Sequence, residues 1–396
     1  MTYDVIVVGA RCTGAPLAMV LSRAGHSVLL LDRGRFPSDT MSTHWVLRPG
    51  VELLAQWGLL PALVRTGCPP IERMSMDFGG CELSGAPTGP HGVAVTYAPR
   101  RVVLDQLLVD AARDAGARLR EGFAVRDVIR EDGRVCGVVG PDGETARARL
   151  VIGADGRNST IARAVGARIT EDCGVLAATA YGYWSGLPVS EVRTGFQPGL
   201  GVSLWPTHDG LTVVSTTMRR AHFLARGRDG ARRTYLDALA RSGVADLVGT
   251  GRLAGRVLSA TNLRNFHRQS HGPGWALAGD AGHHKDPIAA RGISDAFTDA
   301  HTLAAAVHDG LTGAMDMDRA LARYQARRNA GRSAMFDFTC RQAMLEPVDG
   351  ELARLLTVLG SNERAARDML GVFAGARRLE EFFAPANIAG LMAASA

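Results

Sequence analysis

The sequence lacks any Cys-x-x-C pair, although it contains six cysteines. Wide spacing of this kind is typical of neither a zinc site nor a disulfide framework, and it favours a reducing, intracellular compartment. The cysteines are Cys12, Cys68, Cys81, Cys136, Cys173 and Cys340. We therefore expect no metal centre.

Long hydrophobic runs and blocks of like charge are also missing. No stretch approaches the ~20 apolar residues that span a bilayer, and no basic leader precedes the first apolar run, so we expect a soluble, cytoplasmic protein. The formal net charge of +6 comes from arginines scattered along the chain. Basic patches interleaved with aromatic residues are absent, which argues against a nucleic-acid partner.

The residues that are present indicate a globular chain with two or three structural units. Its 396 residues are 46% hydrophobic and 21% charged, which allows sizeable cores. Near the start, "YDVIVV" (3–8) and "HSVLLLD" (26–32) have the continuous apolar character of buried parallel strands, and helical spacing lies between them from Gly14 to Ala24. This βαβ unit predicts a doubly wound, Rossmann-like α/β fold.

Residues 175–270 differ in composition from the segments on either side. Segments there are aromatic and rich in turns, and Asp209-Gly210 is a hairpin signal. We expect a second, mainly antiparallel β domain at 175–270, inserted between residues 1–174 and 271–330 of the first domain. A helical segment at 331–396 completes the predicted order.

The turn "VVGARCTGA" (7–15) resembles a dinucleotide fingerprint with one glycine missing. In G-x-G-x-x-G the first glycine makes the tight turn, the second lets the backbone approach the pyrophosphate, and the third packs the helix on the strand. Gly9 and Gly14 supply the first and third functions, but Arg11 replaces the second. Asp32 ends the next strand, where a ribose-binding carboxylate is expected. A strand, turn and helix without any ligand is the alternative for this motif alone.

Two further motifs each follow a buried strand. They are "GADGRNST" (153–160) and "WALAGDAGHHKDPIAARGISDAF" (275–297). With the glycine turn, they give the chain three landmarks in order, and on these it resembles the FAD-dependent group A monooxygenases, the aromatic-hydroxylase-like flavoproteins. That family shares its fold with geranylgeranyl reductases and flavin halogenases. The resemblance covers essentially the whole chain and implies that residues 1–174 and 271–330 form an FAD-binding domain.

The resemblance also implies roles for single residues. Asp280 would accept a hydrogen bond from a ribityl hydroxyl of FAD, and the helix opening at Gly292 and Ile293 would lie at the pyrimidine edge of the flavin. Arg101 would approach the pyrophosphate, and Asp155 would lie near the diphosphate or be structural. The full predicted cofactor set is Gly9, Arg11, Cys12, Thr13, Gly14, Asp32, Arg33, Arg101, Val125, Asp155, Asp280, Gly292 and Ile293.

Candidate substrate residues lie in the inserted domain. In "AYGYW" the period of two puts Tyr181 and Tyr183 on one face of a strand and Trp184 on the other. Trp205 and Met218 are further candidates, and core packing is the alternative for all of them. If they line the pocket, the substrate is apolar and aromatic or polycyclic.

Three histidines near the predicted flavin site have open roles. His44, on the loop after the second strand, is either catalytic or a structural residue bonded to the backbone. His283 and His284 follow the G-D motif without a metal-ligand grouping. We interpret this pair as cofactor-pocket or helix-capping residues.

The resemblance implies a monooxygenase that uses NAD(P)H and O2 to hydroxylate or epoxidise a small molecule through a C4a-hydroperoxyflavin. No catalytic acid–base pair is obligatory in that chemistry. The first alternative is a geranylgeranyl-reductase-like enzyme, but Pro206 directly after Trp205 departs from that family's substrate motif. A flavin halogenase is the second, and "GVSLWPT" lacks both the first tryptophan and the Ile-Pro of its W-x-W-x-I-P segment.

The side chain at Arg11 constrains the phosphate turn. A residue with a Cβ disfavours the positive φ that glycine adopts readily, so we expect Arg11 to have a negative φ. Our hypothesis is that its charge lies near the FAD diphosphate or the flavin. An arginine pointing into solvent is the alternative.

Overall fold

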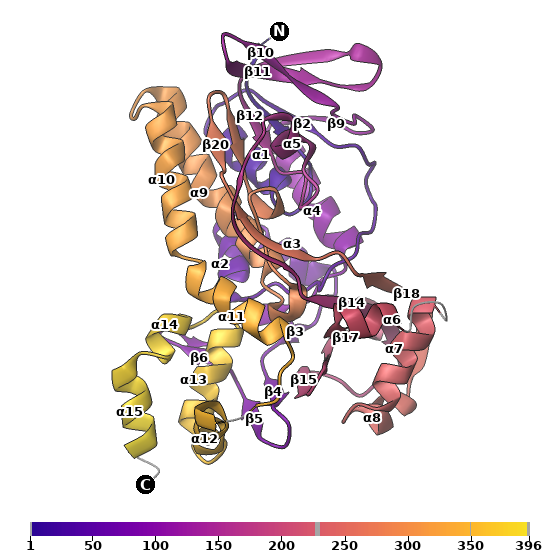
Figure 1. Ribbon diagram of the computed structural model, residues 1–396. Helices are drawn as coiled ribbons and strands as arrows, with labels where there is room; N and C mark the ends of the chain where they lie inside the picture. Colours follow the sequence, from indigo (N-terminus) through magenta and orange to yellow (C-terminus); the bar gives the residue numbers. More distant parts are fainter. Residues whose placement is uncertain (1, 226–229, 349, 394–396) are drawn as a thin grey trace.

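The computed structural model describes residues 2–225, 230–348 and 350–393 of the chain. Its first layer is an eight-stranded sheet, in the upper half of Figure 1, and most of its neighbouring strands run parallel. The strands are β1 (Thr2–Val8), β2 (Val28–Leu31), β9 (Arg118–Arg120), β10 (Asp127–Glu131), β11 (Arg134–Val139), β12 (Thr145–Gly153), β20 (His271–Gly272) and β21 (Trp275–Leu277). The predicted α/β architecture is confirmed.

Strand β1 lies in the middle of this sheet, parallel to both β12 and β2. Val5 and Val7 face one core and Ile6 faces the other, which explains the continuous apolar run. The first core is shared with α1 (Gly14–Arg23), α4 (Arg101–Asp114) and α9 (Gly292–Thr312). Residues of β10, β11 and α5 (Thr160–Ala164) pack in the second core.

The second layer is a seven-stranded sheet in the order β18-β14-β17-β16-β15-β4-β5. Its strands are β4 (Met74–Asp77), β5 (Glu82–Gly85), β14 (Ala177–Ser185), β15 (Val192–Gln197), β16 (Leu200–Pro206), β17 (Leu211–Arg219) and β18 (Arg252–Ala260). All neighbours are antiparallel except β15 and β4. As predicted, a hairpin turns at Asp209-Gly210, where both residues have positive φ.

One predicted boundary needs a correction. Residues 74–85, placed by the sequence in the first domain, form β4 and β5 of the second sheet. These strands are short, and β4 joins the sheet by pairing with β15, more than a hundred residues further along the chain. No local pattern could reveal that long-range pairing. The other domain boundaries stay predictions.

Smaller strand groups connect the two layers. They are β13 (Ile169–Val175), β19 (Arg264–Arg268) and β22 (His283–His284) in one sheet, and the pairs β3 (Pro70–Ile71) with β8 (Thr96–Tyr97) and β6 (Thr88–Gly89) with β7 (Gly92–Val93). Helices α2 (Arg48–Gln56) and α3 (Leu60–Arg65) follow β2, and α6 (Arg220–Ala225), α7 (Gly230–Ala240) and α8 (Ala245–Gly249) cover the second sheet.

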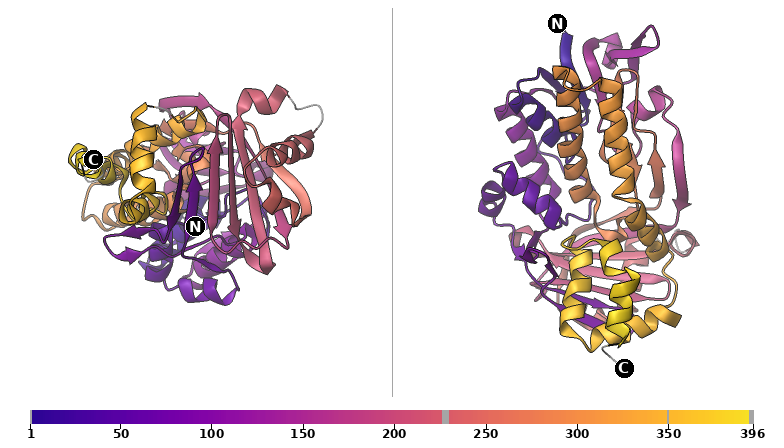
Figure 2. Two further views of the ribbon diagram at one scale, coloured as in Figure 1. Left: turned by 90° about the horizontal axis from the view of Figure 1, so that it is seen from below. Right: turned by 90° about the vertical axis from the view of Figure 1, so that its left-hand side faces the viewer.

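The last third of the chain is mainly helical. Helices α9 and α10 (Met317–Ala330) lie side by side along the first domain, as the right-hand view of Figure 2 shows. The others are α11 (Ser333–Ala343), α12 (Gly350–Gly360), α13 (Glu363–Phe373), α14 (Leu379–Phe382) and α15 (Pro385–Ala393). Helices α12 and α13 contact β5, so the C-terminal segment closes one end of the second sheet. Among the described residues, no helix combines the length and apolar character needed to cross a membrane.

Candidate functional site

The three sequence motifs converge at the carboxyl ends of β1, β12 and β21. Gly9 has a φ of +100°, and a Cβ there would lie 2.4 Å from the carbonyl oxygen of Ala154. A Cβ on Gly14 would lie 1.7 Å from the carbonyl oxygen of Gly9, and one on Gly279 would lie 2.2 Å from Thr13 Oγ1. At Gly9 and Gly14 the neighbouring atom is a backbone carbonyl oxygen, so only glycine fits there, whereas at Gly279 the neighbour is a side chain. We call this group of turns the cradle, comprising residues 9–14, 153–156 and 279–280.

Asp32 holds the cradle in shape. Its Oδ2 accepts a hydrogen bond from the Ala10 amide at 2.7 Å, and its Oδ1 accepts one from the Gly34 amide at 2.7 Å. The structure therefore shows a turn-forming role for this buried carboxylate. Its role toward a ribose stays a prediction. Arg33 beside it is exposed.

Arg11 points away from its turn toward Asp105, a fully buried residue of α4. The Arg11 guanidinium forms an ion pair with Asp105 and donates to Ser38 Oγ at 2.9 Å. Arg101 Nε and Nη2 also donate to Asp105, each at 3.0 Å. Arg11 is not among the described non-glycine residues with positive φ, as expected.

Cys12 completes this cluster, with its Sγ 3.4 Å from Asp105 Oδ1. Burial raises the pKa of the Cys12 thiol, so the thiol stays protonated. Burial alone would lower the pKa of Arg101, but Cys12, Asp105 and Asp280 raise it. The result is a fixed positive charge beside the cradle.

The two aspartates of the later motifs have different surroundings. Asp155 Oδ2 accepts from the amide of Thr160 at 2.7 Å, so Asp155 caps the start of α5. Its other oxygen, Oδ1, is buried without a partner, and burial raises the pKa of the carboxyl. Asp280 is half-buried and makes no side-chain hydrogen bond or close ion pair with any described residue. Its carboxylate is free to bind a hydroxyl.

Helix α9 begins next to the cradle with an open N-terminus. Its first residue, Gly292, is exposed, the next, Ile293, is buried, and no side chain caps the helix. Asp295 in the first turn is paired with Lys285, whose charge, acting against the effect of burial, lowers the pKa of Asp295. An uncapped helix N-terminus favours a negatively charged or polar ligand.

These features fit FAD. The cradle has the backbone clearance that a diphosphate needs, Thr13 at the start of α1 makes no side-chain cap, and no acidic residue lies in the first turn of α1. Arg101 supplies positive charge and Asp280 supplies a free acceptor. Val125, a member of the predicted cofactor set, lies buried in the second core of the first domain.

His44 is fully buried and adopts a φ of 61°. Its Nε2 lies 2.8 Å from the Tyr183 hydroxyl, and the two rings stack with centroids 5.6 Å apart. Tyr181 meets the same imidazole edge-on. Burial, with the charges of Arg101 and Arg100, lowers the pKa of His44 to about 3. The imidazole is therefore neutral at physiological pH, and its Nδ1 has no partner among the described residues.

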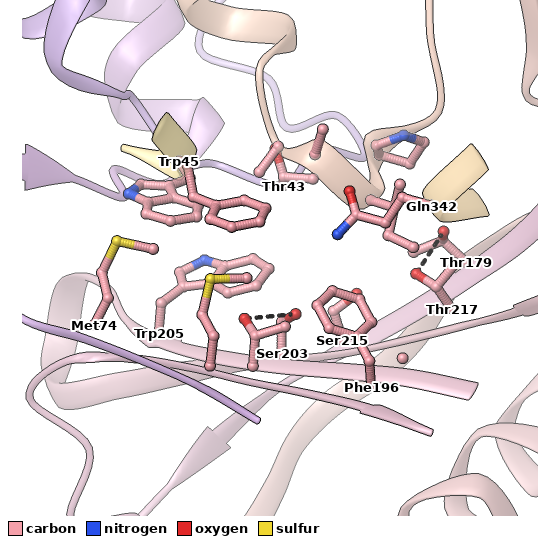
Figure 3. A pocket seen from close by; sticks show the side chains of 18 residues that line it. Thr43, Trp45, Met74, Thr179, Phe196, Ser203, Trp205, Ser215, Thr217 and Gln342 are labelled. Carbon is pink, nitrogen blue, oxygen red and sulfur yellow. Dashed lines mark hydrogen bonds between the residues drawn. The ribbon is translucent and has the colours of Figure 1, made fainter. Parts of the chain in front are cut away.

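A pocket lies between the second sheet and the segment that leads from the cradle to α9 (Figure 3). Its volume is about 40 Å³. Residues 287–290 form one side, and the inner face of the second sheet forms the other. The lining residues are Thr43, Trp45, Met74, Met76, Thr179, Thr194, Phe196, Gly201, Ser203, Trp205, Ser215, Thr217, Pro287, Ile288, Ala289, Ala290, Gln342 and Phe373.

Of the four predicted substrate residues, only Trp205 lines this pocket. Tyr181 and Tyr183 share a face of β14 with the lining residue Thr179, as the period of two requires, but His44 covers that end of the face. Met218 follows the alternative of core packing. It lies on the opposite face of β17 from Thr217, in a core with Tyr235.

His283 and His284, interpreted as cofactor-pocket or helix-capping residues, both belong to β22. Neither lines the substrate pocket, and their role toward the cofactor stays a prediction. His283 packs against His267, with ring centroids 4.3 Å apart, and His284 Nδ1 lies 2.6 Å from the Arg264 carbonyl oxygen. Strand pairing between β22 and β19 places them there, a long-range contact that the sequence does not reveal.

Sequence reasoning missed most of the pocket lining. In β16, Ser203 lies between Val202 and Leu204, so strand periodicity could have found it; Thr194 lies between Arg193 and Gly195, and Ser215 and Thr217 stand in a run of three hydroxyl residues, which gives no such signal. Gln342 and Phe373 come from the C-terminal helices α11 and α13. No local signal marks them, because only tertiary packing brings those helices over the sheet.

Comparison with known proteins defines the family. Residues 2–339 match the model of the FAD binding domain family. The rifampicin monooxygenase of Streptomyces venezuelae is 29% identical over 391 residues, which cover 93% of this chain and 77% of that protein. The digeranylgeranylglycerophospholipid reductase of Methanocella arvoryzae is 26% identical over 88% of this chain and 89% of that protein.

Solved structures share the fold along the whole chain. The flavin-dependent brominase Bmp2 superposes with a TM-score of 0.82 at 18% identity, covering 100% of this chain and 99% of that one. The myxobacterial chondrochloren halogenase CndH gives 0.79 at 22% identity, covering 100% and 96%. The motifs, the cradle and these matches together show that the chain belongs to the FAD binding domain family and is an FAD-dependent oxidoreductase.

Proposed function

We propose that this flavoenzyme is a monooxygenase that hydroxylates or epoxidises an apolar aromatic or polycyclic small molecule with NAD(P)H and O2. One oxygen atom enters the substrate, the other leaves as water, and NAD(P)H supplies the two electrons. Bound FAD would supply the redox chemistry.

The pocket is the observation that carries this proposal. It lies between the second sheet and residues 287–290, directly before the uncapped N-terminus of α9. Trp45, Trp205, Phe196 and Phe373 give it flat apolar walls. Once its lining side chains move apart, such a site would hold an aromatic ring next to the N-terminus of α9 and exclude water.

The protein groups around this site position the substrate and need not transfer protons. His44, with its pKa lowered to about 3, is neutral and is hydrogen-bonded to Tyr183. No Asp, Glu, Lys or Arg lines the pocket in the described part of the chain. This composition supports oxygen transfer to a neutral ring over acid–base chemistry.

The cavity of about 40 Å³ admits only water-sized molecules. A substrate must therefore displace lining side chains as it enters. Phe196 of β15 and Phe373 of the C-terminal helix α13 line the pocket, and they are the side chains that we expect to move.

The test is O2 consumption by the FAD-loaded protein with NADH or NADPH and a panel of planar aromatic compounds. We expect at least one compound to stimulate NAD(P)H oxidation and O2 uptake together and to gain one oxygen atom, measured by mass spectrometry. Uptake of O2 without any oxygenated product across the panel would contradict the proposal.

A reductase that saturates isoprenoid double bonds is the second candidate, favoured by the match to the digeranylgeranylglycerophospholipid reductase over 88% of this chain. The two reactions differ in their need for O2. Anaerobic reduction of a prenyl double bond, with a gain of two hydrogens, would establish the reductase and exclude the monooxygenase.

A further inference from the structure

Two buried polar atoms on side chains that line the pocket have no hydrogen-bond partner among the described residues. They are Trp205 Nε1, a donor on a side chain that is only 3% exposed, and Gln342 Oε1, an acceptor. Figure 3 shows the indole and the amide entering the same space from different sides. Leaving such a group unpaired costs about 1–3 kcal/mol. By contrast, Trp45 in the same pocket donates its Nε1–H to Thr96 at 2.9 Å.

Hydroxyl groups line the floor of the pocket between these two atoms. Thr194, Ser203 and Ser215 lie opposite one another across β15, β16 and β17. Thr179 lies opposite Thr217, and their hydroxyl oxygens are 3.3 Å apart. We call these five residues the hydroxyl row.

The opposite face of the same strands is mostly apolar. Val202, Leu204 and Val214 pack there with Tyr235 in a continuous core, and a strand face buried against a core is normally apolar. Thr212 and Thr216 of β17 also lie on that face, where Thr216 Oγ1 donates to the Ala180 carbonyl oxygen. The pocket face of these strands therefore carries more hydroxyls than the opposite face, and a ligand with polar edges accounts for the excess.

The pocket walls define the shape and charge of that ligand. The indole planes of Trp45 and Trp205 are 19° apart, so the surface between them is flat. No charged side chain lines the pocket in the part of the chain that the structure describes. A carboxylate or ammonium group buried there would lack a partner, which is far more costly than burying a neutral group.

We propose that Trp205 and Gln342 determine the substrate specificity of the enzyme. They select a flat, uncharged aromatic molecule that carries both a hydrogen-bond acceptor, for Trp205 Nε1–H, and a donor O–H or N–H, for Gln342 Oε1. The hydroxyl row binds further polar groups along the same edge. This inference rests on the proposed function for the meaning of the pocket, but it is tested by binding alone.

The test compares three probes of one size with the FAD-loaded protein by isothermal titration calorimetry. 2-Naphthamide carries an acceptor and a donor, naphthalene carries neither, and 2-naphthoate is charged. We expect 2-naphthamide to bind at least tenfold more tightly than the other two. Trp205→Phe and Gln342→Leu should each reduce that preference about tenfold, equivalent to 1.4 kcal/mol.

Matched controls separate specificity from folding. Trp184→Phe makes the same chemical change on the other face of the second sheet, where Trp184 Nε1 donates to the Tyr235 hydroxyl at 2.7 Å. Gln106→Leu changes a glutamine of α4 that does not line the pocket. Both should keep the preference for 2-naphthamide.

Thermal unfolding gives a second readout. Trp205→Phe removes an unpaired buried donor and should raise the melting temperature, whereas Trp184→Phe removes a paired one and should lower it. Equal or absent binding of the three probes, tighter binding of 2-naphthoate, or unchanged selectivity in both pocket variants would overturn the inference.

The same data distinguish this inference from the proposed function. Selective binding of 2-naphthamide that depends on Trp205 and Gln342, without substrate-dependent oxygenation of any compound, would support the specificity and remove the monooxygenase. Oxygenation that depends on neither side chain would support the monooxygenase and remove the specificity inference.

Discussion

The cradle and the pocket lie next to each other but are built in different ways. The cradle consists of three short stretches, and at Gly9 and Gly14 the backbone approaches so closely that a Cβ would collide with a carbonyl oxygen. The pocket consists of side chains from at least six separated segments, between Thr43 and Phe373. The loop at 285–291 forms one side of the pocket and joins the two regions.

This difference implies unequal tolerance to substitution. A Cβ added at Gly9 or Gly14 would lie 2.4 Å or less from a backbone carbonyl oxygen, and that clash could be relieved only by moving a strand or a helix. A side chain in the pocket, by contrast, can be exchanged with only local repacking. We therefore expect substitutions in the cradle to impair FAD binding, and substitutions in the pocket to change the substrate specificity.

The largest expected effect comes from Gly9→Ala. The new Cβ would lie 2.4 Å from the Ala154 carbonyl oxygen, at a φ of +100° that alanine rarely adopts. We expect a loss of ~4 kcal/mol in the free energy of unfolding and no retained FAD. The flavin absorbance of the purified protein and its thermal unfolding measure both effects.

The matched control is Gly25→Ala, because Gly25 also has a positive φ, +86°, but a Cβ there has nothing within 4 Å. It should cost only about 1 kcal/mol and keep the flavin. If both variants lose FAD equally, close backbone approach does not define the cradle.

The next effect concerns Asp286, in the loop that joins the two regions. The side chain is buried, its Oδ1 accepts from the Ile288 amide at 3.0 Å, and its Oδ2 has no described partner. Burial raises the pKa of this carboxyl to about 6, from 3.8. The folded state therefore holds the proton more tightly than the unfolded state.

This difference in pKa between the folded and unfolded states sets the direction in which stability changes with pH. Between pH 4 and pH 6 the unfolded chain loses this proton first, so the folded protein loses stability as the pH rises, by at most about 3 kcal/mol. Asp286→Asn removes the charge and should raise the melting temperature of FAD-saturated protein at pH 8 but not at pH 4. A gain that is equal at both pH values would mean that the carboxyl titrates normally.

A smaller effect is expected at the ligand side of the cradle. Asp280 makes no side-chain hydrogen bond with described residues, so Asp280→Ala should leave folding intact and weaken FAD binding. A charged hydrogen bond contributes about 1.5–3 kcal/mol, which predicts a dissociation constant roughly 10- to 100-fold higher. Titration of the apoprotein with FAD measures it, with the exposed Asp114→Ala as control. Unchanged affinity would show that the carboxylate does not contact the cofactor.

The two regions also differ in how far the sequence predicts them. Gly9 and Gly14 were predicted because a tight turn demands glycine at fixed spacing, whereas the motifs of Asp155 and Gly279 were assigned through the family resemblance. Trp205 and Met218 were proposed without a periodicity argument. Trp205 lines the pocket, and Met218 packs in a core on the outer face, the alternative given for both. Gln342 was missed because the packing of α11 over the second sheet depends on contacts far apart in the chain.

The smallest expected effect tests whether the side chain of Arg11 contributes to FAD binding at the cradle. Arg11 stands where the middle glycine of the fingerprint would be, and its charge is shared with Asp105, which Arg101 also binds through two nitrogens. Its side chain is 29% exposed, so its contribution to binding a diphosphate is partly screened and should be about 0.5 kcal/mol. Arg11→Gly should raise the FAD dissociation constant two- to threefold and weaken its dependence on salt concentration, while the exposed Arg65→Ala should change neither. If both quantities stay at their original values in Arg11→Gly, the arginine serves only to hold Asp105 and Ser38, and the cradle binds FAD through its backbone, Arg101 and Asp280.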